Sequence, residues 1–106
     1  MNENNPFDYR ALDDMLSSRI RLSVVSLLSR CDEAEFTWIR DTVGATDGNL
    51  TVHCRKLEEA GYITVDKRFV DRKPTTFFAL TDKGRRALLE YARRLSDMIR
   101  EEGRPE

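Results

Sequence analysis

The chain has 106 residues, a net charge of -1, and 40% hydrophobic against 35% charged residues. This length suits one small domain, and no stretch approaches the roughly 18 apolar residues of a membrane span. Because the amino terminus, MNENNPFDYR, is polar and acidic instead of resembling a signal peptide, we expect a cytoplasmic protein with no membrane partner.

Two helices are expected before residue 30. From Asp8 to Ser17 the apolar residues recur every three or four positions, which predicts a short first helix. Ser18 is a good N-cap for the next helix, which should end near Ser29. Its apolar stripe at helical spacing consists of Ile20, Val24, Leu27 and Leu28.

A helix-turn-helix is predicted over about residues 36–60. The first of its helices has apolar residues spaced three and four apart and ends at Gly44, a residue type that adopts the left-handed cap conformation easily. Thr46 can cap the second helix, and Gly61 closes it. Its expected core face consists of Leu50, Cys54 and Leu57. Two helices separated by so short a turn form this motif.

A basic hairpin follows over about residues 63–80. From Tyr62 the apolar residues alternate with polar ones, and residues 75–80 form a second β-prone run. The segment VDRKP between them predicts a turn, stiffened by Pro74, that carries Arg72 and Lys73 at its tip. A charged hairpin directly after a helix-turn-helix is typical of a wing.

The last helix is predicted over about residues 82–101, capped by Thr81 and followed by a fraying tail, GRPE. Apolar residues repeat along it at intervals of four, three and four, which is the spacing of a helix-pairing seam. Its first turns are expected to cover the domain core, and the rest to pair with a second subunit. The predicted dimer interface consists of Leu88, Tyr91, Ala92, Leu95, Met98 and Ile99.

Four segments, TDGNL, KLEEAGYI, RKPTT and LTDKGRRAL, follow a known family pattern without a gap, and SRIRLSVVSLL matches the helix before it. Over about residues 8–95 the chain resembles the small single-domain winged-helix regulators related to the multiple-antibiotic-resistance (MarR-like) repressors. The resemblance implies duplex DNA binding as a homodimer, without catalysis. Two residues depart from the family pattern: Val52 replaces a basic or polar residue, and Cys54 replaces leucine.

The expected fold is therefore mainly α with a small β-hairpin wing, a winged helix-turn-helix with a three-helix core plus a carboxy-terminal dimerisation helix. If Leu50, Cys54 and Leu57 face the core, the opposite face of that helix lies in the major groove. There Asn49 suits adenine, Arg55 suits guanine and Val52 suits a thymine methyl. The remaining predicted contacts are backbone approach at Gly48 and phosphate contacts from Thr46, Thr51 and Lys56.

In the hairpin, Arg68, Arg72 and Lys73 are predicted to contact the phosphate backbone, with minor-groove entry an option for Arg72. The alternative is that these charges only discourage sheet pairing. Residues 1–48 carry five basic and nine acidic side chains, a balance of -4, whereas residues 49–106 carry 13 and 10, a balance of +3. Positive charge is thus concentrated in the half that would bind DNA.

Other functions are poorly supported. Cys31, Cys54 and the single histidine, His53, have neither disulfide nor metal spacing, so we expect no metal and no cofactor, with His53 packing or hydrogen-bonding. Redox sensing by a cysteine stays an alternative. The near-neutral total charge leaves a second alternative, a winged-helix protein-interaction module. The operator, the sign of regulation and any small effector are not determined by the sequence.

Overall fold

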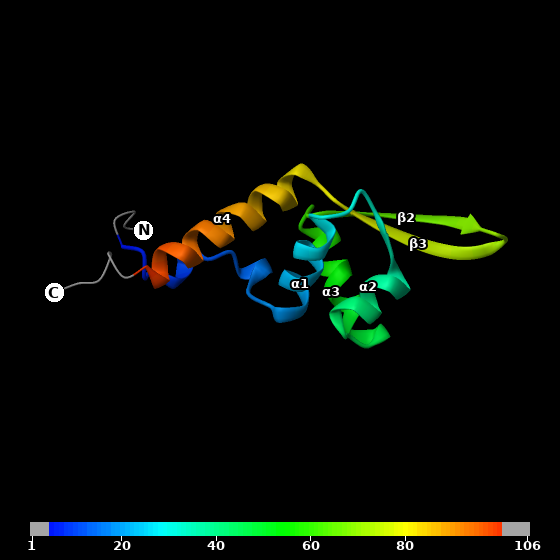
Figure 1. Cartoon of the computed structure of the whole chain (residues 1–106), viewed down its shortest axis with the longest axis horizontal. Coiled ribbons are helices and arrows are strands. Elements are labelled where there is room, and N and C mark those ends of the chain that lie inside the picture. Colours follow the sequence, from blue (N-terminus) through cyan, green and yellow to red (C-terminus); the bar gives the residue numbers. More distant parts are fainter. Residues whose placement is uncertain (1–4, 101–106) are drawn as a thin grey trace.

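Four α-helices and a three-stranded antiparallel sheet make up residues 5–100, the part of the chain that the computed structural model describes (Figure 1). The helices are α1 (Arg19–Leu28), α2 (Phe36–Val43), α3 (Asp47–Glu59) and α4 (Asp82–Ile99). The strands are β1 (Ala34–Glu35), β2 (Ile63–Val70) and β3 (Lys73–Leu80), in the order β1-β3-β2. This confirms the predicted mainly α fold with a β-hairpin wing.

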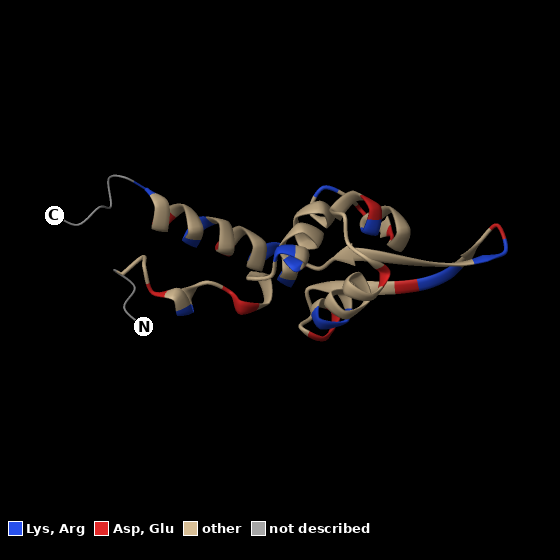
Figure 2. Ribbon diagram, turned by 90° about the horizontal axis from the view of Figure 1, so that it is seen from below, with Lys and Arg blue, Asp and Glu red and all other residues tan. Residues whose placement is uncertain are grey.

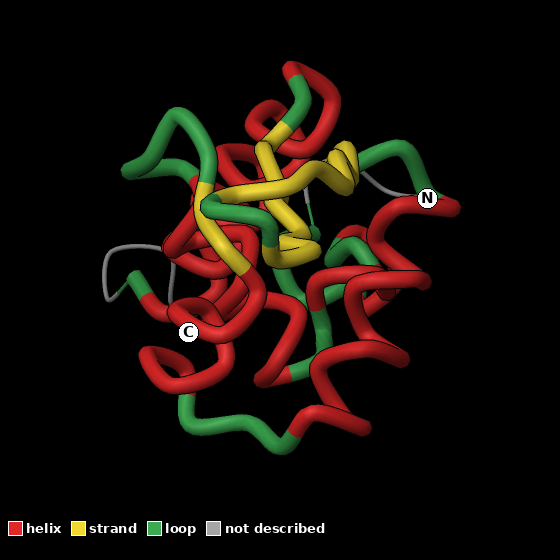
Figure 3. Tube along the Cα trace, turned by 90° about the vertical axis from the view of Figure 1, so that its right-hand side faces the viewer, coloured by secondary structure: helices red, strands yellow, loops and turns green. Residues whose placement is uncertain are grey.

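The molecule is elongated, with extents of 63 × 24 × 21 Å. The β2-β3 hairpin, which we call the wing, projects from one end, and α4 runs toward the other, where the amino-terminal segment also lies (Figure 1). Viewed along this axis, the strands stand in front of the helices (Figure 3). None of the helices in the described region is long and apolar enough to cross a membrane.

The short first helix predicted from Asp8 to Ser17 is wrong. The segment instead forms two 3-10 turns, Tyr9–Ala11 and Asp14–Leu16. Each follows an aspartate whose carboxylate accepts the backbone N–H two residues on: Asp8 from Arg10 at 3.0 Å and Asp13 from Met15 at 2.9 Å. Such local side-chain bonds compete with the α-helical backbone pattern and explain the difference.

The predicted helix boundaries are otherwise confirmed. Ser18, Thr46 and Thr81 each accept the N–H of the residue three positions on, capping α1, α3 and α4. Gly44 and Gly61 have φ of 76° and 79°, the left-handed conformation expected after α2 and α3. Helix α4 ends at Ile99, and the tail GRPE lies outside the described residues.

The core is one apolar cluster centred on α1 and closed by α2, α3 and the base of the wing. As predicted, Leu50, Cys54 and Leu57 point into it from α3. The other buried members are Leu16, Val24, Val25, Leu28, Ala34, Ile39, Ile63 and Phe78. Because this core holds α3 by one face only, its opposite face is left to solvent.

The wing turns on two residues, Asp71 and Arg72, whose φ angles are both positive, at 51° and 68°. This is narrower than the predicted VDRKP turn, because Pro74 lies within β3 opposite Phe69. The pair next to the turn, Val70 and Lys73, occupies the hydrogen-bonding position, so the following pair does not exchange ladder bonds. Pro74 therefore fits without leaving a ladder bond unmade.

Helices α3 and α4 meet at a tight junction. The backbone oxygen of Tyr62 accepts the N–H of Thr81 at 3.0 Å, and the Thr81 hydroxyl donates to the oxygen of Gly61 at 2.7 Å. The ammonium group of Lys83 donates to the backbone oxygen of Ala60 at 2.8 Å. Gly84 is buried against Tyr62 at this point, where a Cβ would lie 2.3 Å from the Tyr62 oxygen.

Candidate nucleic-acid interface

The outward face of α3 is built entirely from exposed residues. All seven candidate contacts on this helix and its cap are exposed: Thr46, Gly48, Asn49, Thr51, Val52, Arg55 and Lys56. Within residues 5–100, neither Arg55 nor Lys56 has a carboxylate within ion-pair distance, and the side-chain amide of Asn49 has no hydrogen-bond partner. The face therefore offers a free guanidinium, a free ammonium and a free amide on one side of a helix held rigidly by its core face.

The turn before α3 is fixed by an ion pair between the two helices of the motif. The Arg40 guanidinium on α2 donates to Asp47, the first residue of α3, at 2.7 Å and to Asp41 at 2.9 Å. These carboxylates raise the pKa of Arg40, with the bond to Asp47 contributing most. Asp47 also suits the positive end of the helix dipole. Its negative charge at the amino terminus of α3 is thus largely offset within the protein.

Gly48 is not required by the fold. Its φ is not positive, and a Cβ built on it meets nothing within 4 Å. A glycine inside a helix is destabilising by about 1 kcal/mol relative to alanine. Because this glycine weakens the helix and no contact within the described part of the protein requires it, it is consistent with close approach of a molecule outside the chain.

His53 is a hydrogen-bonding residue, as expected. Its Nδ1 lies 3.0 Å from the Nη1 of Arg21 on α1, and the Nε of Arg21 donates to the backbone oxygen of Met15. Because arginine can only donate, Nδ1 accepts and the neutral ring carries its proton on Nε2. Desolvation lowers the pKa of His53 below the ordinary 6.5, and Arg21 and Lys56 lower it further.

We expect the free energy of unfolding to fall on acidification because of this histidine. The folded state disfavours the charged ring, so stability is full above about pH 6.5 and is lost as the pH falls through the lowered folded pKa. His53→Gln, which keeps an acceptor for Arg21 but does not titrate, should flatten the profile between pH 8 and 5. Urea unfolding followed by fluorescence of the single tryptophan, Trp38, measures both profiles. Parallel profiles for the two proteins would contradict the assignment.

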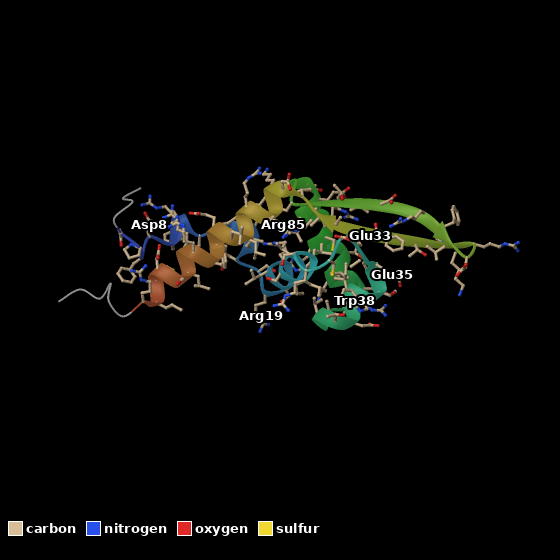
Figure 4. The ribbon with its side chains drawn as sticks, turned by 45° about the horizontal axis from the view of Figure 1, so that its top comes forward. Asp8, Arg19, Glu33, Glu35, Trp38 and Arg85 are labelled. Atoms are coloured by element: carbon tan, nitrogen blue, oxygen red, sulfur yellow. The ribbon has the colours of Figure 1, made fainter. Side chains whose placement is uncertain are left out.

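Arg68 has partners within the protein. Its guanidinium contacts Glu33 at 2.5 Å and Asp66 at 3.5 Å, and its Cζ lies 3.8 Å from the centre of the Phe77 ring. Figure 4 shows Glu33 in the segment between α1 and α2, beside the base of the wing. The bond to Glu33 is the main cause that raises the pKa of Arg68. These contacts anchor the wing to the segment before α2, and the phosphate contact of Arg68 stays a prediction.

Lys67, which was not among the predicted contacts, lies on the side of the wing that faces α3. It lines a cavity of about 250 Å³ together with Thr51, Arg55 and Glu58 from α3, and Val65, Thr76 and Phe78 from the wing. The alternation of side chains along β2 could have shown that Lys67 and Arg68 lie on opposite faces of the wing. Ile63 and Val65 face the helices, and Lys67 follows on the same face. Lys67 and Arg55 therefore border one continuous surface.

The tip of the wing carries a strained arginine. Hairpins with positive φ at both turn residues favour glycine at the second of them, yet this chain has Arg72 there. A left-handed conformation disfavours such a residue by about 1 kcal/mol or more. Figure 2 shows basic and acidic positions together at the tip of the wing, where the turn residues are Asp71 and Arg72. Arg72 and Lys73 are both exposed, and no ion pair of either occurs in the described part of the chain.

Cys54 lines the cavity between α3 and the wing from its buried side, and Cys31 does not line it. Cys54 is 3% exposed, and burial raises the pKa of its thiol to about 11, so it stays protonated at neutral pH. The Cys31 thiol lies 3.5 Å from the backbone oxygen of Leu27, as its donor. Among residues 5–100 no three His, Cys, Asp or Glu side chains gather as metal ligands would.

A second surface with exposed apolar residues lies along α4. Leu88 and Tyr91, predicted at the dimer interface, are half-buried and pack against the core of their own chain, because the first turns of α4 cover it. The exposed stripe lies further round and along the helix. Its large members are Leu89, Leu95 and Ile99, exposed by 64%, 42% and 74%, with Ala92 between them. Met98 is half-buried at its edge.

Comparison with known proteins agrees with this geometry. A family model described as a winged helix DNA-binding domain matches residues 20–99. An uncharacterized protein of Methanocaldococcus jannaschii is 32% identical over 77 residues, which are 73% of this chain and 84% of that protein.

Solved structures share the fold. A transcriptional regulator homologue from Pyrococcus horikoshii is 28% identical and superposes with a TM-score of 0.76 over 89% of each chain. The M. tuberculosis regulator MosR, solved in complex with DNA, has a TM-score of 0.67 at 20% identity, covering 84% of this chain and 63% of its own. The match of the family model over most of the chain, with an exposed α3 and a basic wing, identifies the chain as a member of the winged-helix DNA-binding domain family with the fold of MarR-like regulators.

Proposed function

We propose that the protein is a sequence-specific transcriptional regulator that binds duplex DNA as a homodimer on a palindromic or nearly palindromic operator. The observation that carries the proposal is the outward face of α3, where Asn49, Arg55 and Lys56 have no partners within residues 5–100. Unpaired polar groups on the amino-terminal turns of the second helix of such a motif are what base recognition requires. The proposal includes neither a cofactor nor a catalytic step.

In this proposal α3 lies in the major groove and reads bases directly. Arg55 bonds to guanine, Asn49 bonds to adenine, and the half-exposed Val52 packs against a thymine methyl. Lys56 and the hydroxyls of Thr46 and Thr51 contact phosphates, which set the orientation of the protein. The Thr46 oxygen already accepts the N–H of Asn49, so its own proton remains to donate to a phosphate.

We propose that the whole chain works as one unit, with the helix-turn-helix at about 36–60, the wing at about 63–80 and a dimerisation helix at about 82–101. Apolar exposure supports pairing through α4 and the amino-terminal segment. Of the nine large hydrophobic residues that are exposed within residues 5–100, five lie there: Phe7, Tyr9, Leu89, Leu95 and Ile99. A two-fold dimer presents two copies of α3 to half-sites about 34 to 36 Å apart.

Arg55→Ala is expected to weaken binding to the specific duplex about 5- to 150-fold, which corresponds to about 1 to 3 kcal/mol for a lost bidentate contact. The duplex is first selected from a random pool with the wild-type protein, and affinity is then titrated at fixed salt. Arg86→Ala, an equal charge change at an exposed residue of α4, is the matched control and should change little. Unchanged affinity of the Arg55 variant would overturn its role in base recognition.

The same selection with the wild-type protein distinguishes DNA binding from the competing function, a protein-interaction module. Such a module recovers no duplex from the pool and shows no salt-sensitive retention of DNA. A DNA-binding regulator loses affinity linearly in log salt as it releases counterions from the phosphates. The recovered sequences also report half-site spacing and symmetry, which test the dimer.

A further inference from the structure

Phe69 is a large apolar side chain at the far end of the wing, and the fold does not use it. Its side chain is 75% exposed, among the most exposed aromatic residues of the described chain, and it lies two residues before the turn. Its cross-strand partner is Pro74, so the wing presents an apolar pair close to its tip. Exposed strand edges normally carry charge instead, because apolar ones invite association.

Strand alternation places Phe69 on the face of the wing that continues the surface of α3. Val65, Lys67 and Phe69 share one face of β2, and the first two line the cavity against α3 with Thr51 and Arg55. On β3, Thr76 and Phe78 also line that cavity, and Pro74 follows on the same face. Arg68 points to the other face, where it meets Glu33 and Phe77.

Charge around the ring indicates what it meets. Lys67, Arg72 and Lys73 are exposed near Phe69, and none of them has an ion pair within residues 5–100. Asp71 in the turn is the acidic residue among these three cations. An apolar ring flanked by free cations suits a polyanion with an apolar interior, and duplex DNA is one, with sugars and stacked bases between its phosphate ridges. With α3 in the major groove, a hairpin that projects beyond it is placed to reach the adjacent minor groove, as the amino-terminal arms of homeodomains do.

We propose that the ring of Phe69 enters the minor groove of the bound duplex beside Arg72 and packs against a base step as an apolar wedge. This inference rests on the proposed DNA-binding function. Minor-groove proteins use such wedges to part a base step and bend the duplex, while neighbouring cations hold the phosphates. Burial of the exposed ring favours binding, and the turn that follows it carries the exposed cation Arg72.

The wedge has a sequence consequence. Pyrimidine–purine steps such as TA and CA unstack most easily, so the operator should prefer one of them where each wing lies. Duplexes selected by wild-type protein should show this preference outside the segment read by α3. The same selection with Phe69→Ala should lose it while keeping the α3 segment.

The test compares Phe69→Ala with Val70→Ala on the duplex selected by the wild-type protein. Val70 is the neighbouring apolar residue, 42% exposed, and points to the opposite face of the strand. Phe69→Ala should weaken binding about tenfold, in the range for a lost aromatic–base contact, without changing the slope of log affinity against log salt. It should also reduce the bend of the duplex, measured by energy transfer between its labelled ends. Val70→Ala should behave as wild type.

Failure of the proposed DNA-binding function and failure of the Phe69 wedge give different results. If the wild-type protein selects no duplex, the proposed function itself fails. If the wild-type protein binds its operator but Phe69→Ala binds with equal affinity, equal bend and an unchanged base preference, the wedge is overturned and the DNA-binding function stands. Arg72→Gly provides a contrast, because loss of a phosphate or groove cation should lower the salt slope by about one, which loss of Phe69 should not.

Discussion

Replacing Leu95 with aspartate is expected to give a monomer whose affinity for the operator is at least about 100-fold below that of the wild-type protein, since loss of paired binding commonly costs 10²- to 10⁴-fold. Leu95 lies between Ala92 and Ile99 in the exposed stripe of α4, where two chains are proposed to meet. In a two-fold interface through this stripe the substitution would bury two carboxylates at once.

The large effect follows from the charge of the protein. A net charge of -1 provides no general attraction to DNA, so in the proposed dimer the affinity would depend on using the local cations of α3 and the wing twice. In that dimer, once one copy of α3 is bound, the second would bind as an intramolecular step. A monomer keeps its α3 face intact and still loses this gain.

Arg86→Asp is the control for oligomeric state. It places the same carboxylate on the far side of α4 and makes the net charge more negative than Leu95→Asp does. If charge alone separated the subunits, this control would dissociate first; we expect it to remain dimeric. Sedimentation at several concentrations measures mass, and circular dichroism checks that both variants are folded. A Leu95→Asp variant that sediments as a wild-type dimer would remove α4 from the interface.

The parts of this fold that depend on local rules could be predicted from the sequence. Thr46 and Gly61 mark the ends of α3 because capping is decided within one turn of the chain. The core face of α3 followed from helical spacing alone, and the exposure of the opposite face followed with it. That is why the candidate contacts on α3 all lie at the surface as predicted.

What could not be predicted depends on segments distant in sequence. In the part of the chain that the structure describes, Arg68 has an ion-pair partner and Lys67 does not, because Glu33, more than thirty residues earlier in the sequence, lies beside Arg68. Leu88 and Tyr91 fit a helix-pairing seam by spacing, and the structure adds that both are half-buried against their own core, where α1 contacts α4. The 3-10 turns form because the carboxylates of Asp8 and Asp13 accept backbone N–H groups, a local bonding pattern that competes with the α-helix.

Gly84→Ala should lower the free energy of unfolding by about 2 kcal/mol, although helix propensity alone predicts a gain of about 1 kcal/mol. Gly84 lies in the first turn of α4, where a Cβ would be 2.3 Å from the Tyr62 oxygen and 2.7 Å from Cδ1 of Leu80. The Leu80 side chain can rotate away. The Tyr62 oxygen cannot move freely, because it accepts the N–H of Thr81.

Gly48→Ala is the matched control, because it makes the same change in the first turn of α3, where a Cβ meets nothing. It should raise stability by up to about 1 kcal/mol. At equal protein concentration the Gly84 variant should melt about 10 °C below the wild-type protein, and the Gly48 variant slightly above it. Two shifts of the same sign would show that propensity outweighs the close approach at Tyr62. Opposite signs would establish that the α3-α4 junction needs Gly84, whereas the fold itself does not need a glycine at position 48.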